Sequence, residues 1–151
     1  MLSTLNIAEV ASHLRLVVAR TARRLRQEGL AGEGRSELSP TLSAALATVE
    51  AHGPLTPSEL ADRERVKRPT ATRVVGRLEQ LGLVNRTADP SDGRACVVAI
   101  TAEGRALLRR LRTRKSAFLA KRMRDLDRDE IATLERAAEI LERLLEEKRP
   151  A

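Results

Sequence analysis

Apolar residues recur every three to four positions between residues 7 and 27, with arginines between the later ones. This period predicts an amphipathic helix whose apolar stripe packs against another surface. The stripe consists of Ile7, Val10, Leu14, Val17 and Leu25. Gly29, Gly32 and Gly34 follow, and we expect these glycines to end the helix and to form a flexible connection.

The chemistry of their first turns predicts two further helices. Ser39-Pro40 places an N-cap residue before a proline at the first helical position, and His52-Gly53-Pro54 stops the helix that begins there. Thr56-Pro57-Ser58-Glu59 has the pattern of a capping box, in which the first and last side chains each accept the other residue's backbone amide. We expect this helix to stop near Glu64, because Arg68-Pro69 starts another and the residue before a proline avoids helical backbone.

The helix predicted over residues 69–81 separates an apolar side from a polar one. Its apolar positions are Ala71, Val74, Leu78 and Leu81, and its polar side carries Thr70, Arg73 and Arg77. Gly82 follows as the C-terminal stop. With the short helix before it, this helix forms a predicted helix-turn-helix.

Two short segments of β type come next, over residues 83–87 and 96–100. Between them, Asp89-Pro90-Ser91-Asp92-Gly93-Arg94 is rich in turn formers, so we expect a hairpin with a long polar tip. Thr101 can then cap a fifth helix, which we expect to continue to Leu126.

A second capping box, formed by Asp127 and Glu130, opens a sixth helix. The apolar positions of that helix are Ile131, Leu134, Ala138, Leu141 and Leu145. Their spacing predicts an apolar stripe like that of the first helix.

The order of these elements predicts a fold class that is mainly α with a small β-hairpin wing. We assign residues 38–101 to a winged helix-turn-helix domain, and residues 1–37 and 102–151 to a helical dimerisation region. A domain of 64 residues is marginal alone, and the helices on both sides show more apolar surface than it can cover. We therefore expect a homodimer, whose interface uses Ile7, Val10 and Leu14 with the five apolar positions of the sixth helix.

Composition narrows the choice of partner. The chain holds 28 Lys or Arg residues against 21 Asp or Glu residues, a formal charge of +7 at pH 7, which favours a polyanionic partner. Phe118 is its single aromatic residue, so successive unstacked bases have nothing to stack on, which argues against single-stranded nucleic acid. Double-stranded DNA fits both observations, whereas simple solubility would explain the charge alone.

The helix-turn-helix and the wing carry the candidate DNA contacts. These are Lys67, Arg68, Thr70, Thr72, Arg73 and Arg77 in or just before the second helix, and Ser91, Asp92 and Arg94 in the wing. We expect Arg73 and Arg77 to face base edges and phosphates in a major groove about 12 Å wide. Arg94 could enter the adjacent minor groove, where a narrow A·T-rich stretch concentrates negative potential. Asp92 could hold the Arg94 guanidinium by a charge-assisted hydrogen bond.

Four segments of the predicted helix-turn-helix, wing and fifth helix occur together in an order that is specific in combination. They are Leu55-Thr56-Pro57-Ser58-Glu59-Leu60-Ala61, Thr72-Arg73-Val74-Val75-Gly76-Arg77-Leu78-Glu79-Gln80-Leu81-Gly82-Leu83-Val84, Asp89-Pro90-Ser91-Asp92-Gly93-Arg94 and Ile100-Thr101-Ala102-Glu103-Gly104. In this combination the chain resembles the MarR (multiple antibiotic resistance regulator) family of bacterial transcription factors. The resemblance implies a two-fold dimer, built from the N-terminal helix and the last two helices, that binds pseudo-palindromic promoter DNA and usually represses. It also implies a small anionic or phenolic effector in a crevice between the dimer-forming and DNA-binding parts, although this chain has few aromatic rings to line one.

The leading functional prediction is therefore a sequence-specific, dimeric regulator of transcription. The alternative is an architectural protein that coats DNA with little sequence preference. We do not expect an enzyme, a metal site or a cofactor, because His13 and His52 stand alone and the sequence has neither a glycine-rich phosphate loop nor a nucleophilic serine motif. Cys96 is expected to fill space in a wing strand rather than to sense oxidants.

Two further expectations concern charge and location. Residues 105–128 hold ten Lys or Arg residues and two acidic residues. Three alternatives are open for these basic residues: a solvated face, pairing with the acids of the last helix, or contact with phosphates. No apolar stretch approaches the roughly 20 residues that span a bilayer, and the first residues lack a basic segment before an apolar one. We therefore expect a cytoplasmic protein without a membrane partner.

Overall fold

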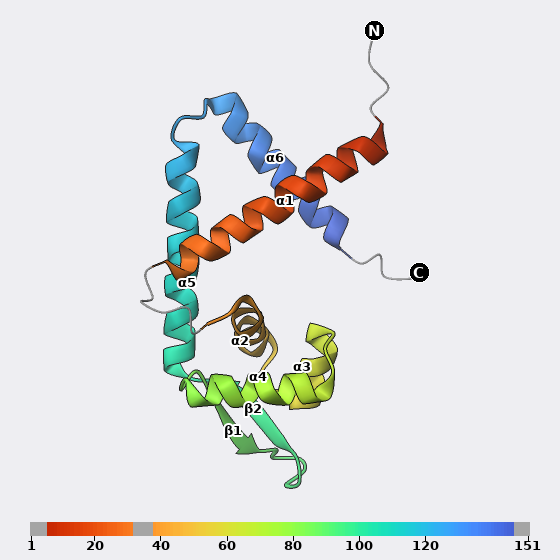
Figure 1. Cartoon of the computed structure of the whole chain (residues 1–151), viewed down its shortest axis with the longest axis vertical. Helices are drawn as coiled ribbons and strands as arrows, with labels where there is room; N and C mark the ends of the chain where they lie inside the picture. The colour runs from red at the N-terminus through yellow and green to blue at the C-terminus, as the bar shows by residue number, and fades with distance from the viewer. Residues whose placement is uncertain (1–5, 32–37, 147–151) are drawn as a thin grey trace. The chain divides into compact units, whose positions relative to one another are not determined.

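The computed structural model describes residues 6–31 and 38–146, so the connection predicted at Gly32 and Gly34 lies outside the described residues. The elements follow the predicted order (Figure 1): α1 (Ile7–Leu30), α2 (Pro40–His52), α3 (Pro57–Glu64), α4 (Arg68–Gln80), β1 (Val84–Ala88), β2 (Cys96–Ile100), α5 (Ala102–Met123) and α6 (Arg128–Leu145). The predicted fold class is confirmed, with helices throughout and one antiparallel hairpin in the described part. The chain divides into two compact units, residues 1–115 and 116–151.

Three helices begin at the cap residues that the sequence predicts. The Ser39 hydroxyl accepts a backbone amide of the first turn of α2 at 3.3 Å. Thr56 and Glu59 form a complete capping box at the start of α3, with bonds of 3.2 Å and 2.8 Å. Asp127 and Glu130 do the same for α6, with bonds of 2.8 Å and 3.0 Å. Each box satisfies two amides that a helix start leaves without partners.

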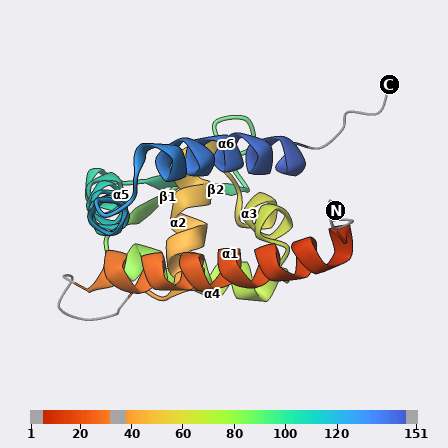
Figure 2. The same cartoon turned by 90° about the horizontal axis from the view of Figure 1, so that it is seen from above.

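The core of the first unit is enclosed by α2, α3, α4, the hairpin and the first turns of α5. Leu46, Leu60, Leu78, Val98 and Leu111 are at most 2% exposed there. Figures 1 and 2 show α2 surrounded by α3, α4 and the hairpin, which agrees with the contacts between these elements. Burial of each such side chain contributes about 1.5–3 kcal/mol, so this cluster holds α4 and the base of the hairpin in one unit.

The base of the hairpin is fastened to the end of α4 and to the start of α5. Gly82 has a left-handed φ of +72°, which turns the chain from α4 into β1. The Thr101 hydroxyl donates to the Gly82 carbonyl at 2.7 Å and accepts the amide of Gly104 at 3.0 Å, so Thr101 caps α5 as predicted. Gly104 is buried so tightly that a Cβ there would lie 2.4 Å from the Leu83 carbonyl oxygen.

The structure corrects three details of the predicted helices. α1 runs through Gly29 to Leu30, because Gly29 is buried where a Cβ would lie 2.9 Å from the Lys115 side chain and the missing side chain admits α5. In α4, Val75 is fully buried whereas Val74 and Leu81 are only half-buried, so the packed stripe is turned from the predicted one. α5 ends at Met123 rather than near Leu126.

Candidate nucleic-acid interface

A short turn separates α3 from α4 and sets the angle between them. α3 ends at Arg65, whose left-handed backbone has φ 54° and ψ 43°. The amide of Val66 then donates to the Ala61 carbonyl at 3.0 Å, which closes the end of α3. Lys67 precedes α4 in extended backbone and makes no side-chain cap bond. The two helices therefore meet through a tight turn, as a helix-turn-helix requires.

The buried side of α4 determines which of its side chains face outward. Ala71, Val75 and Leu78 are buried against the core. Five of the six candidate contact residues near this helix are consequently exposed: Lys67, Arg68, Thr72, Arg73 and Arg77. The structure thus gathers these five on the outer surface of α4, where a ligand can reach them.

The local contacts of the exposed residues differ. The Thr72 hydroxyl donates to the Arg68 carbonyl at 3.0 Å, which leaves its oxygen as an acceptor. Arg77 Nη1 lies 3.4 Å from Gln80 Oε1. Among the residues that the structure describes, Arg73 has neither a hydrogen bond nor an ion pair. Its guanidinium can therefore contact a base or phosphate without breaking an internal bond.

Thr70 is the one candidate on α4 that is not fully exposed. It is half-buried and lines a hollow of about 20 Å³ together with Thr41, Glu64 and Val66. Glu64 also accepts a hydrogen bond from the Thr48 hydroxyl, which ties α3 to α2. Thr70 consequently lies at the edge of the exposed α4 surface, partly turned toward the turn between the helices.

The wing tip is held by hydrogen bonds within itself. The Asp89 carboxylate accepts the amide of Ser91 at 2.9 Å and its hydroxyl at 2.8 Å. These bonds from Ser91 stabilise the charged form, the backbone bond most, and lower the pKa of Asp89. The Asp89 amide also donates to the Ala95 carbonyl at 2.9 Å, which closes the loop that carries Arg94.

Asp92 acts on Arg94 through a different group from the one predicted. Its carboxylate accepts the backbone amide of Arg94 at 3.0 Å, and no bond to the guanidinium is present among the described contacts of this tip. Ser91, Asp92 and Arg94 are all exposed. Asp92 therefore shapes the backbone from which the Arg94 side chain projects and leaves the guanidinium available.

Sequence reasoning missed one contact between the wing and α4. Arg86 on β1 places Nε 3.5 Å from Oε2 of Glu79 on α4. The two residues stand on opposite sides of the Gly82 turn, and an acidic helix residue followed by a basic strand residue is the signal that could have suggested a pair. The pair lies on the same α4 segment as Arg77.

The basic run of α5 is partly paired within the first unit. Arg112 Nη2 lies 2.5 Å from Glu50 Oε2 on α2 rather than beside an acid of α6. Arg114 donates to the Gly29 carbonyl at 3.2 Å. The partners in these two contacts therefore belong to α2 and α1, and neither contact is one with the acids of the last helix, the pairing that the sequence left open.

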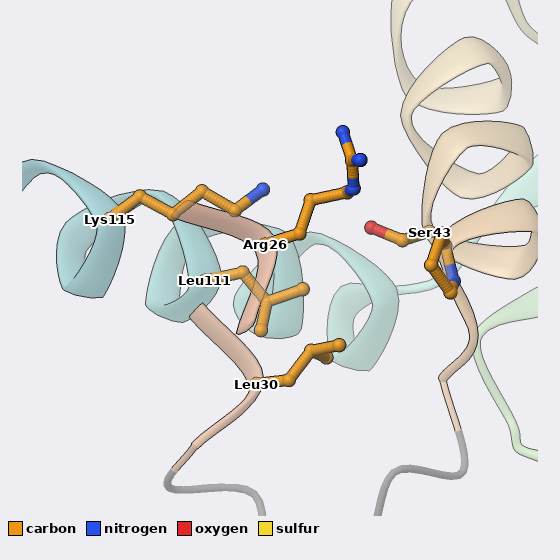
Figure 3. Close-up of a pocket in the computed structure, with 6 residues that line it drawn as sticks. Arg26, Leu30, Ser43, Leu111 and Lys115 are labelled. Carbon is orange, nitrogen blue, oxygen red and sulfur yellow. The ribbon is translucent and has the colours of Figure 1, made fainter. Parts of the chain in front are cut away.

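A small hollow lies where α1, α2 and α5 come together. It is lined by Arg26, Leu30, Pro40, Ser43, Leu111 and Lys115. Figure 3 shows the Arg26 and Ser43 side chains pointing toward the same space. The hollow measures about 10 Å³, close to the room that one water molecule needs. In this conformation it is too small for a phenolic ring.

The residues predicted for a dimer interface lie on two helices with open apolar faces. Ile7, Val10 and Leu14 are exposed on α1, with Ile7 83% exposed. On α6, the positions Ile131, Leu134, Ala138 and Leu145 are exposed and Leu141 is half-buried. None of the described residues of α6 is buried.

The described residues hold no group of three or more His, Cys, Asp or Glu residues placed to ligate a metal. Cys96 has a free thiol and is half-buried at the start of β2. Within residues 6–31 and 38–146, no helix combines the length and the apolar character that crossing a membrane requires.

The fold and the exposed α4 and wing surface define the class of winged helix-turn-helix proteins. A family model described as the MarR family matches residues 38–96. The chain is 36% identical to an uncharacterised HTH-type transcriptional regulator, Mb0904, of Mycobacterium bovis, over 93% of this chain and 95% of the relative. It is 28% identical to the HTH-type transcriptional repressor MdtR of Bacillus subtilis, over 82% of this chain and 79% of the relative.

Solved structures agree with this class. The crystal structure of a "putative transcriptional regulator protein" from Pseudomonas aeruginosa matches with a TM-score of 0.83 and 31% identity, over 97% of this chain and all of the other. The protein belongs to the MarR family of transcriptional regulators. The predicted resemblance is confirmed, and membership in a family of DNA-binding regulators places the chain in that functional class.

Proposed function

We propose that this protein is a sequence-specific regulator that binds double-stranded DNA as a homodimer, on a pseudo-palindromic promoter site, and represses transcription. The observation that carries the proposal is the exposed cationic surface of α4 beside a wing tip with an exposed Arg94. A buried core holds α4 and the base of the hairpin in one unit, which supports their use as a preformed pair of reading elements.

The two surfaces suit different features of DNA. Arg73 and Arg77 project from a helix, and an arginine in the major groove can donate two hydrogen bonds to guanine O6 and N7. Lys67, Arg68, Thr70 and Thr72 then contact phosphates or base edges at the same helix. Arg94, with Ser91 and Asp92 shaping its loop, enters the minor groove and responds to groove width.

The exposed stripes of α1 and α6 support a homodimer. Leu134 is 47% exposed and Leu145 is 83% exposed, which in an isolated chain leaves the apolar side of α6 in water. A second copy of the chain buries these stripes, and a two-fold dimer matches two inverted half-sites on DNA. We accordingly assign residues 38–101 to DNA binding and residues 1–37 and 102–151 to dimerisation.

The sign of regulation and the effector belong to the proposal as well. The Bacillus subtilis relative is named a repressor, and a dimer seated on a promoter blocks transcription most simply by occupying it. An anionic effector would meet Arg26 and Lys115 at the hollow among α1, α2 and α5, provided that the hollow opens beyond its present volume. DNA as the partner implies the cytoplasm as the location.

The test is selection of bound sites from random duplexes, followed by competition at physiological salt. We expect a two-fold symmetric consensus and a preference of about 10³-fold or more over random duplex. An architectural protein would bind unrelated fragments equally well. Equal binding would therefore replace the regulator by that alternative.

A further inference from the structure

Arg86 reaches from the wing across the surface of α4. Its Nε lies 3.5 Å from Oε2 of Glu79. Its Nη2 lies 3.8 Å from the place where a Cβ on Gly76 would stand. The guanidinium therefore lies over Gly76, at the point of α4 where no side chain projects, and reaches Glu79 beyond it.

The strength of this ion pair does not explain its place in the fold. The side chains of Arg86 and Glu79 are 33% and 46% exposed, and pairs this exposed add little to global stability. Gly76 in mid-helix is itself unfavourable compared with alanine. A role in setting the angle between the hairpin and α4 explains this geometry better than a contribution to the stability of the unit.

Other contacts hold the hairpin from its base to the middle of its strands, because Val98, which bonds Leu55, stands opposite Arg86 in the ladder. Leu83 donates its amide to the Leu78 carbonyl at 3.0 Å, and Leu55 and Val98 exchange backbone bonds of 3.1 Å and 2.7 Å. Farther out, the hydrogen bonds that the structure describes for residues 89–95 join these residues to one another. Arg86 thus makes the outermost polar contact described between β1 and α4.

The distance from this contact to the tip makes the angle of the hairpin matter. Ser91 lies five positions after Arg86, which corresponds to at most about 16 Å along the chain. A tilt of about 10° would displace the tip by about 3 Å, which is a full hydrogen-bond length. Arg94 would then miss the minor groove whenever α4 is seated in the major groove.

We propose that Arg86 and Glu79 are positioning residues for DNA recognition, whose ion pair fixes the angle between the wing and α4. This inference rests on the proposed function, because it concerns how two DNA-reading elements are kept in register. A direct contact from Arg86 to a phosphate is the rival explanation. The two differ in the role of Glu79, whose negative charge would oppose a phosphate contact but is required by the ion pair.

The experiment uses the full chain and a duplex that the wild-type protein selects, prepared with A·T-rich and with G·C-rich flanks. The readout is the flank preference, defined as the ratio of the two affinities. We expect Arg86→Ala and Glu79→Gln each to lower it by about threefold to tenfold. The double variant should be no worse than Arg86→Ala alone, because both changes remove one contact.

Matched controls separate positioning from charge and from folding. Arg136 and Glu139 form an exposed pair on α6 at 2.7 Å, and Arg136→Ala and Glu139→Gln should leave flank preference unchanged. Arg86→Lys keeps the charge at shorter reach and should retain part of the preference. The reversed pair, Glu79→Arg with Arg86→Glu, should recover preference relative to Arg86→Glu alone.

The proposal is overturned if Glu79→Gln binds as well as or better than wild type while Arg86→Ala weakens both flank classes equally. Failure of the reversed pair to recover any preference would also contradict it. Loss of preference with an unchanged melting temperature supports it. A wild-type protein without sequence preference would instead refute the proposed function, since that result does not depend on the variants.

Discussion

Residues 38–111 enclose a core within one chain, whereas α1 and α6 leave their apolar stripes exposed. Leu46 is 0% exposed on α2 and Leu145 is 83% exposed on α6, although both are leucines on helices of one chain. An exposed stripe costs the chain the hydrophobic stabilisation that burial supplies. The winged-helix part therefore closes its core within one copy, whereas the two outer helices bury their stripes only in the proposed dimer.

The largest effect is expected from variants that disrupt the exposed apolar stripe of α6. Replacing Leu141 and Leu145 by Lys should yield a monomer or an aggregate that no longer binds DNA, because charge on the stripe prevents association. Sedimentation velocity and DNA binding measure this. Glu139→Lys with Glu146→Lys adds one lysine on α6 and one just after its end, both away from the stripe, and should remain dimeric. A Leu141 and Leu145 variant that stays a dimer with native affinity would place the interface elsewhere.

A variant that creates a cavity in the winged-helix core tests whether that core is closed within one chain. Leu46→Ala should lower the free energy of unfolding by about 2–5 kcal/mol, since Leu46 is fully buried and the space cannot collapse completely. Chemical denaturation measures the change. The variant should keep the oligomeric state of the wild type. A loss below about 1 kcal/mol would show that this core is not the closed unit described.

These two regions also differ in what sequence reasoning recovers. The capping boxes at Thr56 and Asp127 were predictable, because both partners lie within one turn. The end of α1 was not predictable, because a glycine at position 29 is typical of a helix end and only the structure shows that it is buried beside Lys115. The depth of Val75 likewise depends on how α4 is rotated by its neighbours.

The candidate site shows the same limit. Its residue types were predictable from the α4 and wing pattern, and the exposure of Arg73 and Arg94 agrees with that prediction. The pairing of Arg86 with Glu79 and of Arg112 with Glu50 was not, since these partners meet only through tertiary packing. The predicted bond from Asp92 to the Arg94 guanidinium is wrong, because an acid near an arginine in sequence does not reveal which nitrogen it contacts.

Arg73→Ala should have an effect of intermediate size, because it removes one side chain from the DNA-binding surface of α4. Loss of a bidentate contact should reduce discrimination at a few base pairs of each half-site by about 1–3 kcal/mol. Site selection on the variant measures this. Arg136→Ala, on α6, serves as the charge control. Retention of the full consensus by Arg73→Ala would remove this arginine from base recognition.

The smallest effects are expected from variants at the wing tip, which distinguish its role in DNA binding from that of α4. Arg94→Ala should weaken binding to operators with A·T-rich flanks and leave the inner consensus unchanged. Asp92→Ala should give a milder version, and the double variant should be no worse than Arg94→Ala, because Asp92 acts through the backbone amide of Arg94. Asp92→Asn keeps an acceptor oxygen and should resemble wild type. Additive Asp92 and Arg94 effects, or Arg94→Ala binding both flank classes like wild type, would contradict the wing assignment.

The mass of the complex on a selected duplex decides whether two copies pair through the exposed helices and present two DNA-binding units to one site. Sedimentation equilibrium should give twice the chain mass of 16.6 kDa for the free protein, and two chains on each duplex. A single chain that binds the duplex with full sequence discrimination would contradict this pairing.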